Sequence, residues 1–258
     1  MPVPRTSPWM GGRLPSMNMS NELTIVIPAK NEEKLLPRLL NSLLRQDYPL
    51  MSNTRVFVAD ALSGDATVES AESFGDRLAI KVIPGGLPSV GRNAGAKLAD
   101  THYVLFLDAD IELADPVLLR RALALMNRKR LHCVTTDIMC RDGRPSDDLL
   151  YVLNNIAQRG SRFFRPFATG MFMLVEKAVF DALGGFDERA LYAEDYQLTR
   201  QIERTRFRVV RGGIYSTNRR FRKMGRKAIF RLFLRTAFHS GKPDFFRSEL
   251  HRAYWEAY

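Results

Sequence analysis

The sequence predicts an α/β protein with a Rossmann-like, mostly parallel central sheet flanked by helices, followed by a helical, basic C-terminal extension. Three observations support this prediction. From residue 23 onward, short apolar runs alternate with longer amphipathic stretches, which is typical of parallel strands joined by crossover helices. The 258 residues, 45% of them hydrophobic and 26% charged, suffice for one large globular domain. The excess of basic residues lies at the C-terminal end.

The first half of the chain predicts a regular alternation of strands and helices. Its apolar runs predict four strands, at residues 23–28, 55–59, 78–83 and 103–107. The amphipathic stretches between and after them predict three helices, at residues 32–45, 66–74 and 90–99. Strands separated by helices of this length are expected to pair in parallel.

The second half of the chain is less regular. It predicts helices at residues 116–130, 177–183 and 194–204, and strands at residues 132–136, 172–175 and 209–215. Because no internal repeat or Gly/Ser linker divides the chain, residues 21–221 are expected to form one domain. Residues 1–20 are expected to be a flexible leader, and residues 222–258 a basic amphipathic helical extension.

The distribution of charge separates the two ends of the chain. Residues 200–258 hold 16 Lys and Arg against four Asp and Glu, whereas residues 1–199 sum to −1 of the total net charge of +11. In residues 226–238, Lys227, Arg231 and Arg235 fall in line at the helical period, with apolar residues on much of the opposite arc. This end predicts either a polyanionic neighbour, which is a phosphate-bearing substrate, an anionic membrane or nucleic acid, or an ordinary solvated charged face.

Two further features limit the class of protein. Cys133 and Cys140 are too few for a disulfide framework, so both are expected to be reduced thiols. The sequence has no run of about 18 apolar residues that would span a bilayer, and its first 20 residues lack the apolar segment of a secretory signal. We therefore expect a cytoplasmic protein, and not a processive synthase with a channel of its own.

Acidic side chains follow the predicted strands. In open α/β sheets the ligand lies beyond the carboxyl ends of the strands, and here Glu32, Asp60, Asp108 and Asp110 come at or just after those ends. Asp108 and Asp110 alternate, so two hard oxygen ligands lie on one side of the chain. They suit Mg²⁺ or Mn²⁺ bound to a diphosphate, whereas the alternative is a surface turn with two solvated acids.

Two other segments carry groups suited to group transfer. The glycine-rich turn before Arg92 opens a predicted helix, so its amides and the guanidinium are expected to bind phosphate, unless the turn only caps the helix. Asp195 begins another predicted helix. Its carboxylate is suited to take a proton from an attacking hydroxyl, and the alternative is an acid that stabilises the helix dipole.

Six motifs taken together resemble those of the family 2 glycosyltransferases, which have the GT-A fold. The resemblance extends over residues 23–221, in order and in spacing. The motifs are TIVIPAKNE at 24–32, VADALSGDAT at 58–67, GRNAG at 91–95, LDAD at 107–110, GGFDE at 184–188 and ED at 194–195.

The resemblance implies a nucleotide-sugar donor and, usually, inversion at the anomeric carbon. It places five residues at the donor: Pro28, Glu32, Asp60, Arg92 and Asp108. Glu32 and Asp108 are implied to lie near the ribose. Asp60 is implied to accept a hydrogen bond from the base, for which uracil is expected, and Arg92 to contact the base or the diphosphate.

The remaining implied residues belong to the metal and the acceptor. Asp110 is implied to be the principal ligand of a divalent cation, Mn²⁺ or Mg²⁺, and Asp195 the catalytic base. We expect the acceptor between Asp195 and the segment around residues 169–172, so Gly170, Met171 and Glu194 are predicted on the acceptor side. The acceptor hydroxyl is expected on a glycan, either lipid-linked or part of the cell envelope.

The basic segment 216–225 is predicted to be a loop that folds over the donor, with Arg219 and Arg220 on its phosphates, or else a solvated turn. The helix at 226–238 is predicted either to lie on an anionic membrane or to pack on the domain. Two other functions stay open: a noncatalytic nucleotide- or anionic-surface-binding module, and a nucleotidyltransferase. Nucleic acid is not expected as a partner.

Overall fold

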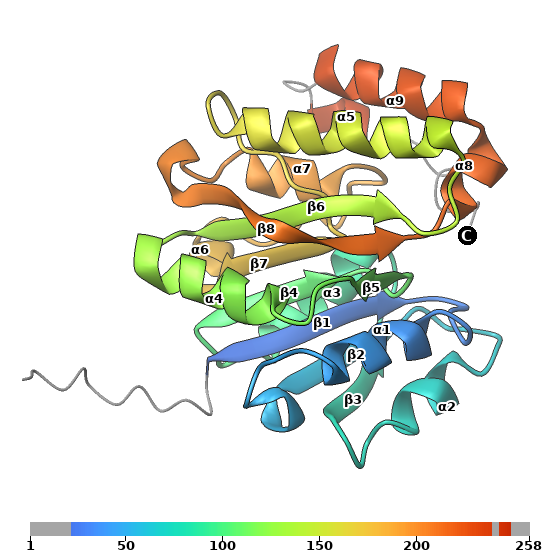
Figure 1. Cartoon of the computed structure of the whole chain (residues 1–258), viewed down its shortest axis with the longest axis vertical. Helices are drawn as coiled ribbons and strands as arrows, with labels where there is room; N and C mark the ends of the chain where they lie inside the picture. Colours follow the sequence, from blue (N-terminus) through green and yellow to red (C-terminus); the bar gives the residue numbers. More distant parts are fainter. Residues whose placement is uncertain (1–21, 239–242, 249–258) are drawn as a thin grey trace, which may run out of the picture.

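The computed structural model describes residues 22–238 and 243–248. The predicted leader therefore lies outside the described residues, as does much of the end of the extension. A curled sheet of eight strands runs through the molecule, with helices on both faces (Figure 1). The strands are β1 (Leu23–Ala29), β2 (Arg55–Asp60), β3 (Ala79–Pro84), β4 (Tyr103–Leu107), β5 (Ile111–Leu113), β6 (Cys133–Cys140), β7 (Phe172–Glu176) and β8 (Phe207–Ser216).

The strand order is β3-β2-β1-β4-β7-β6-β8-β5. The four strands of the first half pair in parallel, as predicted, and β6 pairs in parallel with β8. Antiparallel pairing joins β4 to β7, β7 to β6, and β8 to β5. The sheet is thus mixed, with parallel pairs in the majority, and the carboxyl ends of β1 to β4 meet at one edge.

The helices are α1 (Leu36–Leu44), α2 (Thr67–Glu72), α3 (Pro88–Lys97), α4 (Leu118–Lys129), α5 (Pro145–Ser161), α6 (Lys177–Ala182), α7 (Glu194–Thr199), α8 (Arg219–Met224), α9 (Arg226–Phe238) and α10 (Pro243–Phe246). Two single 3-10 turns occur at Met51–Asn53 and Arg204–Arg206. Every helix predicted from the first half of the sequence is present.

The core lies on both faces of the sheet because strand side chains alternate. Along β1, Ile25 and Ile27 join one buried cluster and Val26 joins the other. Helices α1 and α4 cover the first cluster, whereas α3, α6 and α7 cover the second. The packing is closest where Gly95 of α3 meets β1, since a Cβ there would lie 2.4 Å from a methyl of Val26.

Four elements differ from the prediction. Helix α1 begins at Leu36 and not at residue 32, because residues 30–33 form a loop at the edge of the sheet. Helix α5 and the short strand β5 were not predicted. The basic segment predicted as a loop contains the helix α8, six residues long.

The extension continues as helices that pack on the domain. Ile229 of α9 is 4% exposed and belongs to the larger core cluster. Phe246 of α10 is also buried, and its carbonyl accepts a hydrogen bond from the Leu191 amide at 2.8 Å. The predicted boundary between residues 221 and 222 falls inside α8. Among the described residues, no helix is both long enough and apolar enough to cross a membrane.

Candidate active site

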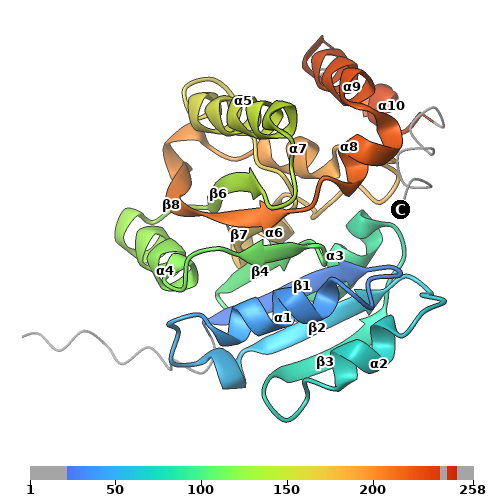
Figure 2. The same cartoon turned by 45° about the vertical axis from the view of Figure 1, so that its right-hand side comes forward.

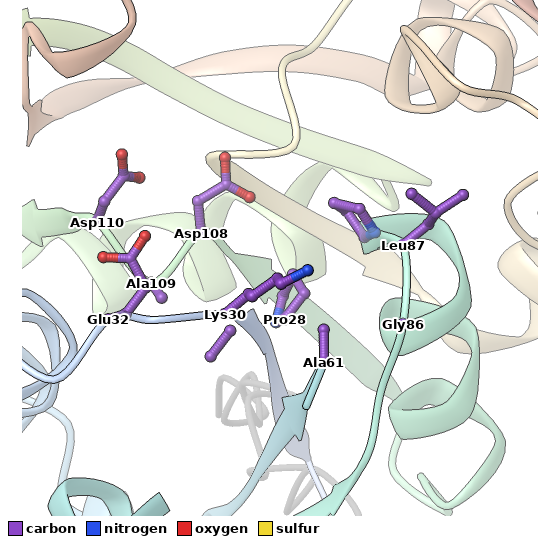
Figure 3. Close-up of a pocket in the computed structure, with 11 residues that line it drawn as sticks. Pro28, Lys30, Glu32, Ala61, Gly86, Leu87, Asp108, Ala109 and Asp110 are labelled. Atoms are coloured by element: carbon purple, nitrogen blue, oxygen red, sulfur yellow. The ribbon is translucent and has the colours of Figure 1, made fainter. Parts of the chain in front are cut away.

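A cleft of about 320 Å³ opens at the carboxyl edge of β1 to β4 (Figure 3). The carboxylates of Glu32, Asp108 and Asp110 lie along one side of it, and the turn that carries Gly86 and Leu87 lies across from them. The lining residues come from the loops that follow four strands. They are Pro28, Ala29, Lys30, Glu32, Ala61, Gly86, Leu87, Pro88, Asp108, Ala109 and Asp110.

Glu32 is a buried carboxylate paired with an arginine from the far end of the chain. The two terminal nitrogens of Arg219, Nη1 and Nη2, both donate to it, and the contact from Nη1 to Oε2 measures 3.3 Å. Arg219 Nη2 also lies 3.5 Å from Asp110 Oδ2. Burial raises the pKa of Glu32 to about 7; Arg219 opposes this rise, whereas the nearby Asp110 and Asp108 add to it. This side of the cleft therefore gathers three carboxylates, two of which contact Arg219.

The loop that carries Glu32 is held by the segment after β2. The Glu32 amide donates to Thr67 Oγ1 at 2.7 Å, and the Asn31 amide donates to Ser63 Oγ at 2.9 Å. Ser63 Oγ in turn donates to Asp60 Oδ1 at 2.5 Å. Through these bonds the side chains of the second motif fix the loop of the first motif at the mouth of the cleft.

Arg92 links the cleft to the start of α7. Its guanidinium donates to Asp108 at 2.5 Å and to Glu194 at 2.6 Å, and only 3% of the side chain is exposed. The paired carboxylates raise the pKa of Arg92 further above its ordinary value, although burial opposes them, so the charge is permanent. Gly170 packs directly on this guanidinium, since a Cβ at that position would lie 2.4 Å from Nη2.

Asp195 lies on the other side of Glu194 and is held by two backbone amides. Gly170 donates to its Oδ2 at 2.6 Å, and Tyr196 donates to its Oδ1 at 2.7 Å. Burial and the adjacent Glu194 carboxylate raise the pKa of Asp195 to about 7, and Arg92 and the two amides oppose this. A carboxylate with such a pKa is suited to accept a proton near neutral pH.

The structure brings most of the predicted residues together. Pro28, Glu32, Asp108 and Asp110 line the cleft, and Arg219 reaches it from α8. Asp60 and Arg92 do not line it: the first bonds Ser63, and the second is buried behind Asp108. Gly170 and Glu194 contact Asp195 and Arg92, whereas Met171 packs against the core. The side chain of Arg220 lies outside what the structure describes.

The sequence analysis missed part of the cleft. Lys30, Ala61 and Leu87 line it, although none was singled out. Their common signal is position, because each lies within three residues of the end of a parallel strand. The pairing of Glu32 with Arg219 gave no such signal, since the two residues are 187 positions apart.

The chemistry of the cleft fits a divalent cation bound together with a diphosphate. No group of three or more His, Cys, Asp and Glu side chains suited to a metal occurs in the described part of the chain. Mg²⁺ and similar hard cations, however, are commonly held by one or two carboxylates plus substrate phosphates. Asp110 and Asp108 supply such oxygens beside the buried carboxylate of Glu32, whose pKa is raised chiefly by burial.

A comparison with protein families identifies the chain. The model of the family described as glycosyl transferase family 2 matches residues 24–184, which include β1 to β7. The chain belongs to glycosyl transferase family 2. It is therefore a glycosyltransferase, and the resemblance inferred from the six motifs is confirmed.

Two relatives match shorter segments at higher identity. The poly(ribitol-phosphate) beta-N-acetylglucosaminyltransferase TarS of Staphylococcus aureus is 36% identical over 93 residues, which are 34% of this chain and 16% of TarS. The validoxylamine A glucosyltransferase of Streptomyces hygroscopicus subsp. jinggangensis is 38% identical over 106 residues, which are 40% of this chain and 25% of that protein. The chain thus spans a quarter or less of the length of these relatives.

Solved structures show the same fold. Residues 1–349 of S. aureus TarS in complex with UDP-GlcNAc superpose with a TM-score of 0.62 at 23% identity, over 76% of this chain and 58% of that one. The mannosyltransferase PcManGT from Pyrobaculum calidifontis, in complex with GDP-Man and Mn²⁺, superposes with a TM-score of 0.62 at 20% identity, over 89% and 68%. The fold is of the GT-A type, as expected.

Proposed function

We propose that this glycosyltransferase moves a sugar from a nucleoside diphosphate donor, with UDP as the nucleotide, to an acceptor hydroxyl, with a divalent metal and inversion at the anomeric carbon. The observation that carries the proposal is the arrangement of carboxylates around Arg92, which joins the cleft to Asp195. This arrangement supports the proposal because it joins the carboxylates of the cleft to Asp195, our candidate proton acceptor. A donor site and an acceptor site need this proximity.

Asp110, assisted by Asp108, would hold the cation together with the diphosphate oxygens. When bound, a divalent cation neutralises the charge that develops on the departing nucleoside diphosphate. Pro28 and Glu32 form the wall where we place the nucleoside, and Asp60 is proposed to face the base from the end of β2. The TarS and PcManGT complexes contain UDP-GlcNAc and GDP-Man, which supports a nucleotide-sugar donor for this chain as well.

Asp195 is proposed to take the proton of the acceptor hydroxyl as that oxygen attacks the anomeric carbon. The Gly170 and Tyr196 amides fix the carboxylate, and the pKa of about 7 lets it act as a base at neutral pH. Inversion follows from a single displacement, since one base suffices for it. We place the acceptor against Gly170, Met171 and Glu194.

Arg92 is proposed as a positioning residue rather than a donor ligand, because its guanidinium is buried and already paired twice. It holds Asp108 at the cleft and Glu194 beside Asp195 in one rigid unit. Arg219 is proposed to leave Glu32 for the donor diphosphate, with Arg220 from the same helix beside it. A bidentate guanidinium is well suited to phosphate, and the Glu32 pair keeps Arg219 at the mouth of the cleft.

The acceptor is proposed to be a glycan or lipid-linked glycan at the cytoplasmic face of a membrane. The relative TarS is named as a poly(ribitol-phosphate) transferase, which implies an anionic acceptor for that protein, and the C-terminal end of this chain is strongly basic. Lys227, Arg231 and Arg235 are exposed along α9, where they would meet anionic headgroups. Reversing these three charges to Glu is expected to abolish salt-sensitive binding to anionic vesicles; unchanged binding would contradict this part of the proposal.

A thermal-shift screen of nucleotides and nucleotide sugars, with and without Mn²⁺, tests the donor site. A ligand that binds the folded state raises the melting temperature, so one nucleoside diphosphate is expected to raise the melting temperature only when Mn²⁺ is present. The Asp110→Asn variant is expected to lose the metal-dependent part. If no nucleotide shifts the wild-type chain, the noncatalytic binding module becomes the better interpretation. Release of nucleoside diphosphate from the nucleotide sugar with the matching base then indicates a glycosyltransferase and not a nucleotidyltransferase.

A further inference from the structure

Helix α5 has its polarity reversed relative to an ordinary surface helix. The side that meets the sheet is polar: Asp147 and Gln158 are fully buried there, together with Tyr151. Gln158 Nε2 donates to the Thr136 carbonyl at 3.2 Å, and Asn155 Nδ2 donates to the Ile138 carbonyl at 2.8 Å. The helix is therefore docked on β6 by hydrogen bonds to the strand backbone, and its outer side faces away from the sheet.

That outer side is apolar. Four residues at the helical spacing i, i+3, i+4 and i+7 project from it, and two phenylalanines follow directly after the helix. Their exposed fractions are 57%, 50%, 46%, 62%, 60% and 82% for Leu149, Val152, Leu153, Ile156, Phe163 and Phe164. We call these six residues the α5 apolar face. A contiguous exposed patch of this kind marks an interaction site, because isolated apolar side chains are normal on a surface and a row of six is not.

The charges around the α5 apolar face indicate its partner. Arg162 and Arg165 are exposed beside the two phenylalanines, and the one exposed acid of α5, Asp148, lies at the opposite end of the helix. Helix α9, with three further exposed cations, lies at the same end of the molecule as α5 in both views (Figures 1 and 2). Apolar side chains bordered by cations match a bilayer that contains anionic lipid. A second copy of the chain on this face would bring like charges together, which disfavours self-association.

We propose that the α5 apolar face inserts into the interfacial layer of an anionic membrane, with Phe163 and Phe164 as its anchors and the basic α9 against the headgroups. The two helices supply different parts of the interaction. Ile229 of α9 is buried in the core and does not face a membrane; we assign the apolar contact to the α5 apolar face and the charge to Lys227, Arg231 and Arg235 of α9. Aromatic side chains are preferred at the membrane interface, which suits the two phenylalanines.

The position of the α5 apolar face bears on the acceptor. Only five residues separate Phe164 from Gly170, whose amide binds Asp195, so the chain between them spans at most about 20 Å. A membrane-bound acceptor would thus meet the enzyme on the side of the catalytic base. This consequence rests on the proposed function, whereas membrane binding itself does not.

Sedimentation of the full chain with vesicles tests the proposal. We expect binding to phosphatidylcholine vesicles that contain phosphatidylglycerol, and much weaker binding to phosphatidylcholine alone. Phe164→Ser is expected to weaken binding by about tenfold, and the triple variant Ile156→Ser, Phe163→Ser and Phe164→Ser to abolish it. The matched control is Leu98→Ser at the end of α3, which removes another exposed leucine and is expected to bind like the wild type.

Two further measurements keep the outcome unambiguous. Phe164→Trp is expected to show a blue shift of the added emission on phosphatidylglycerol vesicles, which needs no loss of fold. Light scattering is expected to show the same mass for the wild type and the triple variant. A wild type that is a dimer, together with a triple variant that is a monomer, would assign the α5 apolar face to a second copy and overturn the proposal. So would a wild type that stays in the supernatant, or a triple variant that still sediments.

The nucleotide response separates this proposal from the proposed function. The triple variant is expected to keep the Mn²⁺-dependent thermal shift of the wild type, because the substituted residues lie outside the cleft. Vesicle binding without any nucleotide response would refute the proposed function and leave the membrane surface standing. A nucleotide response without vesicle binding would do the reverse.

Discussion

Gly170→Ala probes the buried unit that joins the cleft to Asp195. An added methyl group would lie 2.4 Å from Nη2 of Arg92 and 2.8 Å from its Cζ, far inside the contact distance of about 3.5 Å for heavy atoms. The guanidinium has no room to retreat, because only 3% of the side chain is exposed and Asp108 and Glu194 hold it at 2.5 and 2.6 Å. The substitution must therefore break an ion pair or move the backbone.

The size of the effect follows from these contacts. Overpacking of a tight site costs about 1–3 kcal/mol, and loss of one partner from a buried ion pair costs about 3–5 kcal/mol. We expect the free energy of unfolding to fall by about 3 kcal/mol. For a domain of this size that corresponds to a drop in melting temperature of roughly 6–12 °C. Transfer activity is expected to fall as well, because Gly170 also positions Asp195.

Denaturant unfolding of the variant beside a matched control measures the effect. Gly160→Ala is the control, because a Cβ at that position in α5 meets no atom within 4 Å. It is expected to leave the free energy of unfolding within about 1 kcal/mol of the wild type, and to raise it if it changes at all. If Gly170→Ala were as stable as this control, the account of Arg92 as a tightly packed link would be refuted.

Three other substitutions test separate parts of the site. Because the pKa of Asp195 is about 7, the transfer rate is expected to rise with pH up to about pH 7 and then level off, and Asp195→Asn to lose at least about a hundredfold; a rate independent of pH would contradict the assignment. Glu32 binds its proton more tightly in the folded state, so the stability that this proton contributes is lost as pH rises through about 7. Between pH 5 and pH 8, the free energy of unfolding of Glu32→Gln is therefore expected to gain up to about 3 kcal/mol relative to that of the wild type, as measured by denaturant unfolding at both pH values. A difference in stability that does not change with pH would show that burial does not raise the pKa of Glu32. Arg92→Lys is expected to lower the free energy of unfolding by about 3 kcal/mol in the same assay, since one ammonium does not bridge Asp108 and Glu194 as the guanidinium does. Retention of full stability would show that this bridge does not stabilise the fold.

The local pattern of apolar and polar residues predicted most of the strands and helices. Strands β1 to β4 and helices α1 to α4 could be predicted because their apolar residues follow the period of the element that they form. Helix α5 could not, because its buried side holds Asp147 and Gln158 and its apolar residues face outward. A prediction that assumes apolar residues face the core fails on such a helix. Strand β5 is only three residues long, too short for a period to show.

The candidate site was predictable in its parts but not in its connections. The carboxylates of Asp108 and Asp110 follow a strand and were found from that position alone. The ion pairs of Arg92 with Glu194 and of Arg219 with Glu32 join residues 102 and 187 positions apart, and only tertiary packing brings them together. For the same reason the buried position of Arg92 behind Asp108 was not foreseen, and Arg92 was expected to contact the donor directly.

The central claim is that the cleft binds the donor through Asp110 while Asp195 serves only the chemistry. Calorimetric titration of UDP in the presence and absence of Mn²⁺, on the wild type, Asp110→Asn and Asp195→Asn, tests it most directly. Mn²⁺-dependent binding is expected for the wild type and for Asp195→Asn, and its loss is expected for Asp110→Asn. Equal, Mn²⁺-dependent affinity in Asp110→Asn would contradict the account.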